Sequence, residues 1–277
     1  MIDEPIFAAI EQIEAEAWAQ LHVALPAEHR AQLGCEVKRY GAAVSILTPG
    51  ADVASCNRTI GLGLERSLTE GQLTEVIASY TAAGVPRWLL DWSPKAEPRS
   101  AESLFARHGG RAKTPIVKLW RTLGRALPVF PETAVRVVEI DGKDAETFEK
   151  IVAEPLGFPP MVAPVVRSTV GHADWHFYLA FDGARPIAGS ALFVRGAGAW
   201  FGLSATMATD RGRGAQTQLL ARRLRDAASF GCTWVSADTQ PETAERPNPS
   251  LRNMRRAGMN VLYERAKYLF ETAQPPR

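Results

Sequence analysis

The sequence lacks any apolar run near the roughly 18–20 residues that a membrane-spanning helix needs, which excludes a spanning protein. It has three cysteines, Cys35, Cys56 and Cys232, which are odd in number and too widely spaced for a disulfide framework or a Cys-x-x-Cys metal knuckle. The start, Met1-Ile2-Asp3-Glu4, is acidic where a secretory signal would be basic. We therefore expect a reduced, cytoplasmic protein with no metal and no membrane partner.

An excess of one charge is also missing. Lys and Arg number 32 against 30 Asp and Glu, a formal net charge of +2, whereas a nucleic-acid binder usually shows a strong basic bias. We expect no nucleic-acid partner. Hydrophobic residues make up 46% of the 277 residues, which is enough to form a sizeable core, and this length suits two domains or one large one.

The best candidate for a domain boundary is the stretch from 125 to 134, where Pro128 and Pro131 oppose regular structure. It divides the chain into residues 1–124, a linker at 125–134 and residues 135–277. Each half is predicted to follow one order: helix, strands, a central helix, a strand, a short helix and a final strand. This mixture predicts an α/β (α+β) fold class, with a sheet flanked by helices in each half.

The periodicity of apolar residues places these elements. In the second half it predicts strands at 135–140, 175–181, 186–194, 200–207, 233–237 and 261–270, with helices at 144–152, 215–230 and 250–257. In the first half it predicts helices at 6–21, 73–83 and 101–108, with strands at 44–47, 59–64, 88–92 and 116–120.

The segment Asp210-Arg211-Gly212-Arg213-Gly214-Ala215-Gln216 follows a predicted strand and opens the helix at 215–230. Its two glycines let the backbone turn tightly, and the free N–H groups of the first helical turn favour an anion. Arg211 and Arg213 add charge that suits phosphate. The segment predicts a pyrophosphate site; the alternative is an ordinary strand-to-helix loop with solvated arginines. Neither a Walker loop nor the full dinucleotide fingerprint is present.

This loop is followed by a long helix, a strand and then the element Asn248-Pro249-Ser250 through Gly258. Over residues 135–270 the combination resembles the GCN5-related N-acetyltransferase family, although Gln216 stands where Gly or Ala is more frequent. The resemblance implies two tandem acyl-CoA N-acyltransferase-like domains, each with a mixed, mostly antiparallel sheet. It also implies acetyl-CoA as acyl donor, with its pyrophosphate on the loop and its pantetheine beside the Asn-Pro-Ser element. The cofactor-binding residues it implies are Ala205, Thr206, Met207, Arg211, Gly212, Arg213, Gly214, Ala215, Gln216, Asn248 and Ser250.

Many members of the family carry a tyrosine six residues after the Asn, where its phenol can protonate the departing thiolate. Here that position is Met254, which has no proton to give, and Tyr263 downstream is either a substitute or a structural residue. A general base is not identified by sequence, so the catalytic residues stay unknown. The candidates for the base are Glu139, His172, His176, Asp238, Glu242 and Glu245.

The first half has no such loop, because its equivalent stretch from Glu65 to Gly71 carries acidic residues that repel phosphate. We interpret it as a degenerate copy without cofactor. The predicted function is transfer of acetyl from acetyl-CoA to a primary amine of a small-molecule or peptide acceptor, by direct attack. A homodimer is compatible with the sequence. The alternatives are an acyl-CoA-binding pseudoenzyme or sensor without turnover, and a nucleotide-dependent enzyme.

Overall fold

The computed structural model describes residues 4–124 and 126–272, and the chain forms two compact units. The first unit holds residues 1–116 together with 264–277, and the second unit holds residues 117–263. The division expected from the sequence also covers residues 1–3, Arg125 and residues 273–277, which lie outside the described residues. Residues 126–134 of the expected linker belong to the second unit, where the Gln218 side chain donates a hydrogen bond to the carbonyl oxygen of Pro131 at 2.7 Å.

The second unit is built on a sheet with the strand order β5-β10-β9-β8-β7-β6. Neighbouring strands run antiparallel except β9 and β10, which run parallel because a helix, α6, carries the chain from one to the other. The strands are β5 (Arg111–Thr122, of which 117–122 lie in this unit), β6 (Val135–Glu139), β7 (Trp175–Asp182), β8 (Arg185–Arg195), β9 (Gly198–Thr206) and β10 (Trp234–Thr239).

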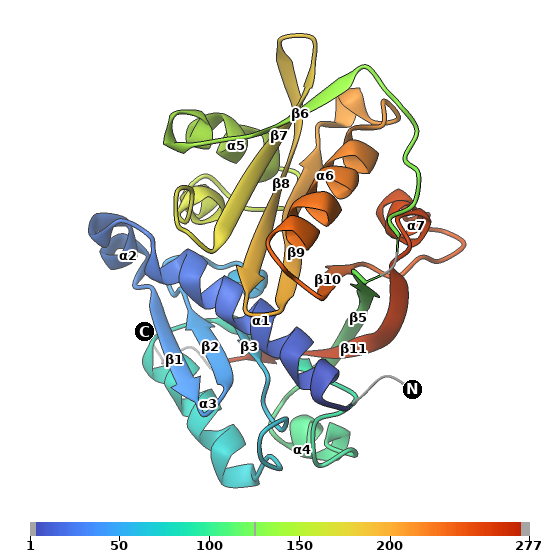
Figure 1. Ribbon diagram of the computed structural model, residues 1–277. Helices are drawn as coiled ribbons and strands as arrows, with labels where there is room; N and C mark the ends of the chain where they lie inside the picture. Colours follow the sequence, from blue (N-terminus) through green and yellow to red (C-terminus); the bar gives the residue numbers. More distant parts are fainter. Residues whose placement is uncertain (1–3, 125, 273–277) are drawn as a thin grey trace. The chain divides into compact units, whose positions relative to one another are not determined.

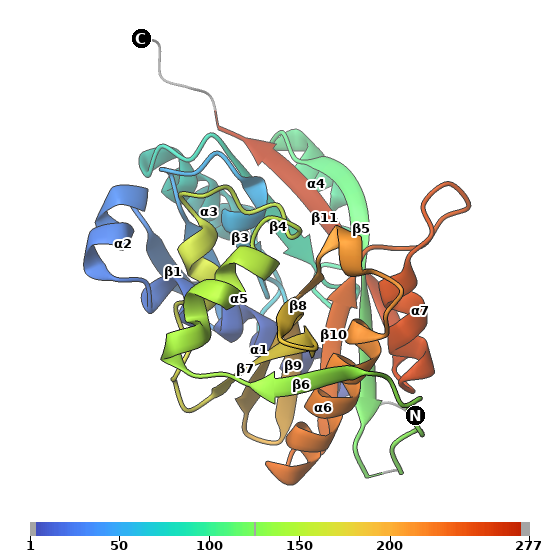
Figure 2. The same ribbon diagram turned by 90° about the horizontal axis from the view of Figure 1, so that it is seen from above.

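Helices cover both faces of this sheet, as Figure 2 shows for α5 and α6. Ala188 of β8 packs in the same cluster as Leu219 of α6, whereas a Cβ at the next residue, Gly189, would meet Phe148 of α5. Since successive strand residues point to opposite faces, the two helices lie on opposite faces. The helices are α5 (Ala145–Val152), α6 (Ala215–Ser229) and α7 (Pro249–Arg256), with 3-10 turns at Gly142–Asp144, Ala163–Arg167 and Ala208–Asp210.

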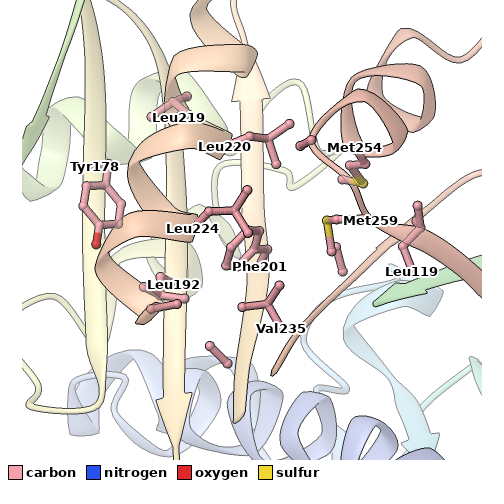
Figure 3. Close-up of a cluster of buried hydrophobic side chains, with 14 of the residues drawn as sticks. Leu119, Tyr178, Leu192, Phe201, Leu219, Leu220, Leu224, Val235, Met254 and Met259 are labelled. Atoms are coloured by element: carbon pink, nitrogen blue, oxygen red, sulfur yellow. The ribbon is translucent and has the colours of Figure 1, made fainter. Parts of the chain in front are cut away.

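One apolar cluster fixes α6 and α7 to the strands (Figure 3). Leu220 and Leu224 of α6 contribute side chains that are at most 1% exposed, and burying such a side chain contributes about 1.5–3 kcal/mol. The first turns of both helices are therefore held in place relative to the end of β9. The residues labelled in Figure 3 are Leu119, Tyr178, Leu192, Phe201, Leu219, Leu220, Leu224, Val235, Met254 and Met259.

The first unit repeats this plan with the strand order β1-β2-β3-β4-β11. β3 and β4 run parallel and are joined by α3, and the other pairs are antiparallel. The helices and strands are α1 (Glu4–Val23), α2 (Ala27–Leu33), β1 (Glu36–Tyr40), β2 (Ala43–Leu47), the 3-10 turn Ala54–Cys56, β3 (Arg58–Ile60), α3 (Glu70–Ala82), β4 (Arg87–Trp92), α4 (Glu102–Arg107) and β11 (Asn260–Glu271, of which 264–271 lie in this unit). Figure 1 labels the helices and most of these strands, and Figure 2 labels β4.

Buried charges lie under α1 on one face of the first unit's sheet. Arg265 donates to Glu11 at 2.8 Å and to Glu14 at 2.6 Å, and Arg58 donates to Asp91 at 2.8 Å. Burial of so many charges is tolerated because each is paired. The opposite face, under α3 and α4, is apolar and aromatic, with Trp88 stacked on Tyr80 and on Phe270. The two faces of this sheet thus have different chemistry.

Each half of the sequence gives its final strand to the sheet of the other half. Residues 117–122 of β5, the last strand of the first half, pair with β10 from Trp234↔Thr122 to Thr239↔Val117. Residues 266–271 of β11, the last strand of the chain, pair with β4 from Ala266↔Trp92 to Glu271↔Arg87. The compact units therefore are not two consecutive stretches of sequence.

The predicted fold class is confirmed in both units, and the helices and strands follow the predicted order. The predicted strand at 59–64 ends at Ile60, because Gly61 and Gly63 adopt φ angles of +91° and +77° that no strand continues. Helix α2 and strand β1 were not predicted from the sequence. Among the described residues no helix combines the length and apolar character required to cross a membrane.

Candidate functional site

A cavity of about 630 Å³ opens in the second unit where the end of β9 meets the starts of α6 and α7. This volume suits a ligand of substantial size. Residues 204–206 form one wall of the cavity. The second wall is formed by residues 210–214, called the glycine loop below, together with the first turn of α6, and the third wall is formed by α7. Pro155 and Leu156, which follow α5, also line the cavity. The lining residues are Pro155, Leu156, Ser204, Ala205, Thr206, Asp210, Arg211, Gly212, Gly214, Ala215, Gln216, Thr217, Asn248, Pro249, Ser250, Asn253 and Arg256.

A bulge in β9 opens the wall formed by residues 204–206. Leu203 and Ser204 together stand opposite the single residue Ser190 of β8, because the register shifts between Gly189↔Ala205 and Ala191↔Gly202. Leu203 has a φ angle of +46°, which is a costly conformation for a branched residue. The parallel pairing of β9 with β10 ends at Phe201↔Ala237, and beyond this point Ser204, Ala205 and Thr206 line the cavity.

The first turn of α6 presents backbone N–H groups to the same cavity. Gly214 is the N-cap, with a φ angle of +85°, and no side chain caps the helix. Ala215, Gln216 and Thr217 all line the cavity, and the N–H groups of a first turn have no partner within the helix. Together with the helix dipole, these donors favour an anion at this point.

Gln216 joins the first turns of α6 and α7. Its amide nitrogen donates to Ser250 Oγ at 2.6 Å, and its amide oxygen accepts from Asn253 Nδ2 at 2.6 Å. The departure from Gly or Ala at this position thus has a structural role. Asn248 caps α7, accepting from the Leu251 N–H at 3.1 Å and donating to the carbonyl oxygen of Gln240 at 2.6 Å. Its side chain therefore shapes the wall of the cavity.

Asp210 is the first residue of the glycine loop and fixes the loop to Arg185 of β8. It is 1% exposed and accepts two hydrogen bonds from the Arg185 guanidinium, at 2.6 and 2.8 Å. These bonds lower the pKa of Asp210 to about 2, against the opposing effect of burial. Arg213 pairs with Asp182 and approaches Asp210 at 3.7 Å, so its charge is used in ion pairs, and it does not line the cavity. Arg211 and Arg256 are exposed guanidinium groups on the cavity wall.

Of the residues predicted to bind the cofactor, all but two line this cavity. The two are Met207, which is 37% exposed beyond the end of β9, and Arg213, which is paired as described. Eight residues that were not predicted from the sequence also line it: Pro155, Leu156, Ser204, Asp210, Thr217, Pro249, Asn253 and Arg256. For Asn253 a signal existed, because Ser250 and Asn253 are one helical turn apart and thus share a face of α7.

No tyrosine lines the cavity among the described residues. Met254 is 4% exposed and packs in the apolar cluster between α6 and α7 (Figure 3), so this position points away from the cavity. Tyr263 is 9% exposed and does not line the cavity. The side chain of Cys232 is buried, which raises the pKa of its thiol and suits a core residue.

The residues weighed as a general base lie elsewhere in the second unit. His176 contacts Glu139 at 2.7 Å and stacks on Phe230. Asp238 accepts from the indole N–H of Trp200 at 3.0 Å, and Glu242 accepts from the N–H of Asn248 at 2.9 Å. None of the residues weighed as a base, His172 and Glu245 included, is part of the cavity wall. No group of the described residues is therefore assigned to proton transfer.

The equivalent place in the first unit, between β3 and α3, is closed. Thr69 and Gln72 form a reciprocal capping box at the start of α3, with both hydrogen bonds at 3.2 Å. A Cβ at Gly63 would lie 2.6 Å from Trp92 and 2.7 Å from the carbonyl oxygen of Glu97, so neighbouring residues fill the space. The helix start that is open in α6 is thus capped and covered in α3.

Comparison with known proteins identifies the fold. No protein-family model and no curated protein sequence matches the chain. Among solved structures, a GCN5-related N-acetyltransferase from Kribbella flavida superposes with a TM-score of 0.62 at 18% identity, covering 95% of this chain and 96% of that one. A GCN5-related N-acetyltransferase from Sphaerobacter thermophilus gives 0.59 at 19% identity, with 83% and 80% covered. A tandem protein of this kind from the clavulanic acid biosynthesis pathway gives 0.58 at 14% identity, with 95% and 96% covered.

These matches extend over nearly the whole chain, so they include both units. The chain has the fold of the tandem GCN5-related N-acetyltransferases.

Proposed function

We propose that the chain is an acetyl-CoA-dependent N-acetyltransferase whose site is the cavity of the second unit. The observation that carries this proposal is the uncapped start of α6 beside the bulged end of β9, in one cavity of about 630 Å³. An anion site and an open strand edge in one cavity suit a ligand with a pyrophosphate and an amide-containing arm. The resemblance of the loop and of the Asn-Pro-Ser element to the family supports the same assignment.

The residues present fit this donor. The N–H groups of Ala215, Gln216 and Thr217 would hold the pyrophosphate, with Arg211 adding charge-assisted hydrogen bonds. An added Cβ at Gly212 would have no atom within 4 Å, so the loop leaves room for phosphate oxygens. The backbone of Ser204 to Thr206 would pair with the amides of the pantetheine arm, as one strand pairs with another.

Acetyl-CoA supplies, when bound, a thioester that is activated toward an amine. The neutral nitrogen of the acceptor forms a bond to the carbonyl carbon, the carbon–sulfur bond breaks, and the proton lost by the nitrogen goes to solvent or to the departing thiolate. The backbone N–H groups next to the bulge would stabilise the negative charge on the carbonyl oxygen, at a strength of a few kcal/mol per donor. Positioning supplies the remainder, since no covalent enzyme intermediate is required.

The absence of an acid at Met254 is compatible with this chemistry. The thiolate of a thiol with a pKa of about 8.5 is a good leaving group, and water or the protonated nitrogen of the attacking amine can protonate it. The acceptor is a primary amine of a small molecule or peptide. The apolar residues Pro155 and Leu156 at the rim favour an acceptor with an apolar portion.

The test is release of CoA. The protein is mixed with acetyl-CoA and a pooled library of primary amines, free thiol is measured with time, and acetylated products are identified by mass spectrometry. We expect release that depends on both the protein and the amine pool. Saturable binding of acetyl-CoA without any release would contradict an enzyme and favour the sensor.

A further inference from the structure

Arg223 is a buried cation without a counter-charge. It lies in the third turn of α6, its residue is 1% exposed, and no carboxylate of the described residues is within ion-pairing distance. Burial lowers its pKa to about 9, which leaves it charged at neutral pH. Its Nη2 is buried without a hydrogen-bond partner in the described part of the chain. Such a group is unfavourable for folding, and apolar residues often replace buried charges without loss of stability.

Arg223 Nε donates to the carbonyl oxygen of Leu219 within α6 at 3.3 Å, and the other contacts of the Arg223 guanidinium lie beside the bulge. Its Nη1 donates to the carbonyl oxygen of Ala191 in β8 at 3.2 Å, and its guanidinium lies 4.5 Å from the ring centre of Phe201 in β9. Ala191 forms the last pair of its register, Ala191↔Gly202, before the shift. Phe201 is the last residue of β9 that pairs with β10. One side chain thus ties α6 to both strands at the point where β9 leaves the regular sheet.

The bulge needs such support. Leu203 has a φ angle in the left-handed region, which is strained for this residue, and the ladder between β8 and β9 is interrupted where two residues face one. Without support at this point, residues 204–206 would lose their fixed position at the cavity wall. The cofactor loop begins the same helix that carries Arg223, so this residue connects the two walls of the site.

We propose that Arg223 is a positioning residue that holds the bulge, and thereby aims the N–H groups at Ser204 and Ala205 at the thioester carbonyl. This inference rests on the proposed function. On this proposal Arg223 lowers the stability of the fold and is needed to polarise the carbonyl. A residue with a core-packing role would instead raise the stability and have no effect on the carbonyl.

The test compares Arg223→Leu with Arg225→Leu, an exposed residue of the same helix that serves as the matched control. The readout is the infrared band of acetyl-CoA labelled with ¹³C at the carbonyl, bound to each protein, together with thermal unfolding and the affinity for CoA. In the parent and in Arg225→Leu we expect the band to shift to lower frequency than in free acetyl-CoA. In Arg223→Leu we expect the band near its free position, unfolding at the parent temperature or higher, and CoA affinity within about threefold of the parent.

Arg223→Lys keeps the charge with a single donor group and is expected to give an intermediate band. If Arg223→Leu does not fold, the same measurement on Arg223→Lys and Arg223→Met decides. The proposal is overturned if Arg223→Leu is folded and gives the carbonyl band at the frequency seen in the parent. It is also overturned if the variants lose thermal stability in proportion to their loss of the band shift, because that result indicates a packing role. Failure of the parent to bind acetyl-CoA at all contradicts the proposed function instead, because that result precedes any effect of Arg223.

Discussion

Substitution of Gly214 by Val tests whether the start of α6 is the cofactor site. Gly214 has a φ angle of +85°, and a Cβ there would lie 2.8 Å from Thr133 Cγ2. A β-branched residue is strained in this conformation at a cost of about 1–3 kcal/mol, so the backbone is expected to shift. The N–H groups of Ala215, Gln216 and Thr217 then lose their common direction. A hydrogen bond to a charged group contributes about 1.5–3 kcal/mol, so loss of one alone weakens CoA binding at least about tenfold.

The control is Gly231→Val at the other end of the same helix. Gly231 has a φ angle of +82° with nothing within 4 Å of an added Cβ, so it carries the backbone strain without any contact with the cavity. Calorimetric titration with CoA and thermal unfolding are measured for both variants. We expect reduced stability in both and reduced affinity in Gly214→Val alone. The reasoning is refuted if Gly214→Val is folded and binds CoA as tightly as the parent, or if Gly231→Val loses the same affinity.

Further outcomes follow from other parts of the structure. Titration of the parent should give one CoA per chain, because the start of α3 is capped by Thr69 and Gln72 while that of α6 is open; two equivalent sites would contradict this. A chain starting at Thr133 should aggregate on expression, because it lacks the residues of β5 that pair with β10, and a soluble monomer that binds CoA would show this wrong. Asp210 has a lowered pKa of about 2, so the stability it contributes is present above pH 4 and lost as the pH falls toward 2. Acid unfolding of Asp210→Asn should therefore lack part of this pH dependence, and identical acid curves for the two proteins would contradict the assignment.

Local patterns predicted most of the fold. The helix at α6 combines apolar residues at helical spacing with glycines at both ends, Gly214 and Gly231, and these signals are contained in one stretch of sequence. The strand β1 was missed because Glu36 to Tyr40 carries charges on an edge and buries none of its side chains fully. Similarly, α2 is a short polar helix whose single fully buried residue is Leu33.

The candidate site was predictable where it depends on the loop itself and not where it depends on distant partners. Gly212 and Gly214 mark a tight turn before a helix, and that turn lines the cavity. The pairing of Arg213 with Asp182 joins residues of separate elements, so the same arginine that suggested a phosphate ligand is used in an ion pair. The exchange of final strands is equally inaccessible, because an apolar strand such as residues 116–120 carries no mark of which neighbour it will pair with.

That exchange has a consequence for synthesis on the ribosome. β4 pairs with β3 on one edge, but it acquires a partner on its other edge only when β11 has been made, and Ala266 follows its partner Trp92 by 266 − 92 = 174 positions. Because the ribosome adds about 5–20 residues per second, this edge of β4 stays without its strand partner for roughly 9–35 s. Arg265 arrives with the same strand, so until then the ion pairs of Arg265 with Glu11, Glu14 and Asp91 are missing, although Arg58 is already present to pair with Glu14 and Asp91. The part of the chain that is translated first is thus among the last to be completed, and the nascent first unit is the form of this protein that a chaperone would meet.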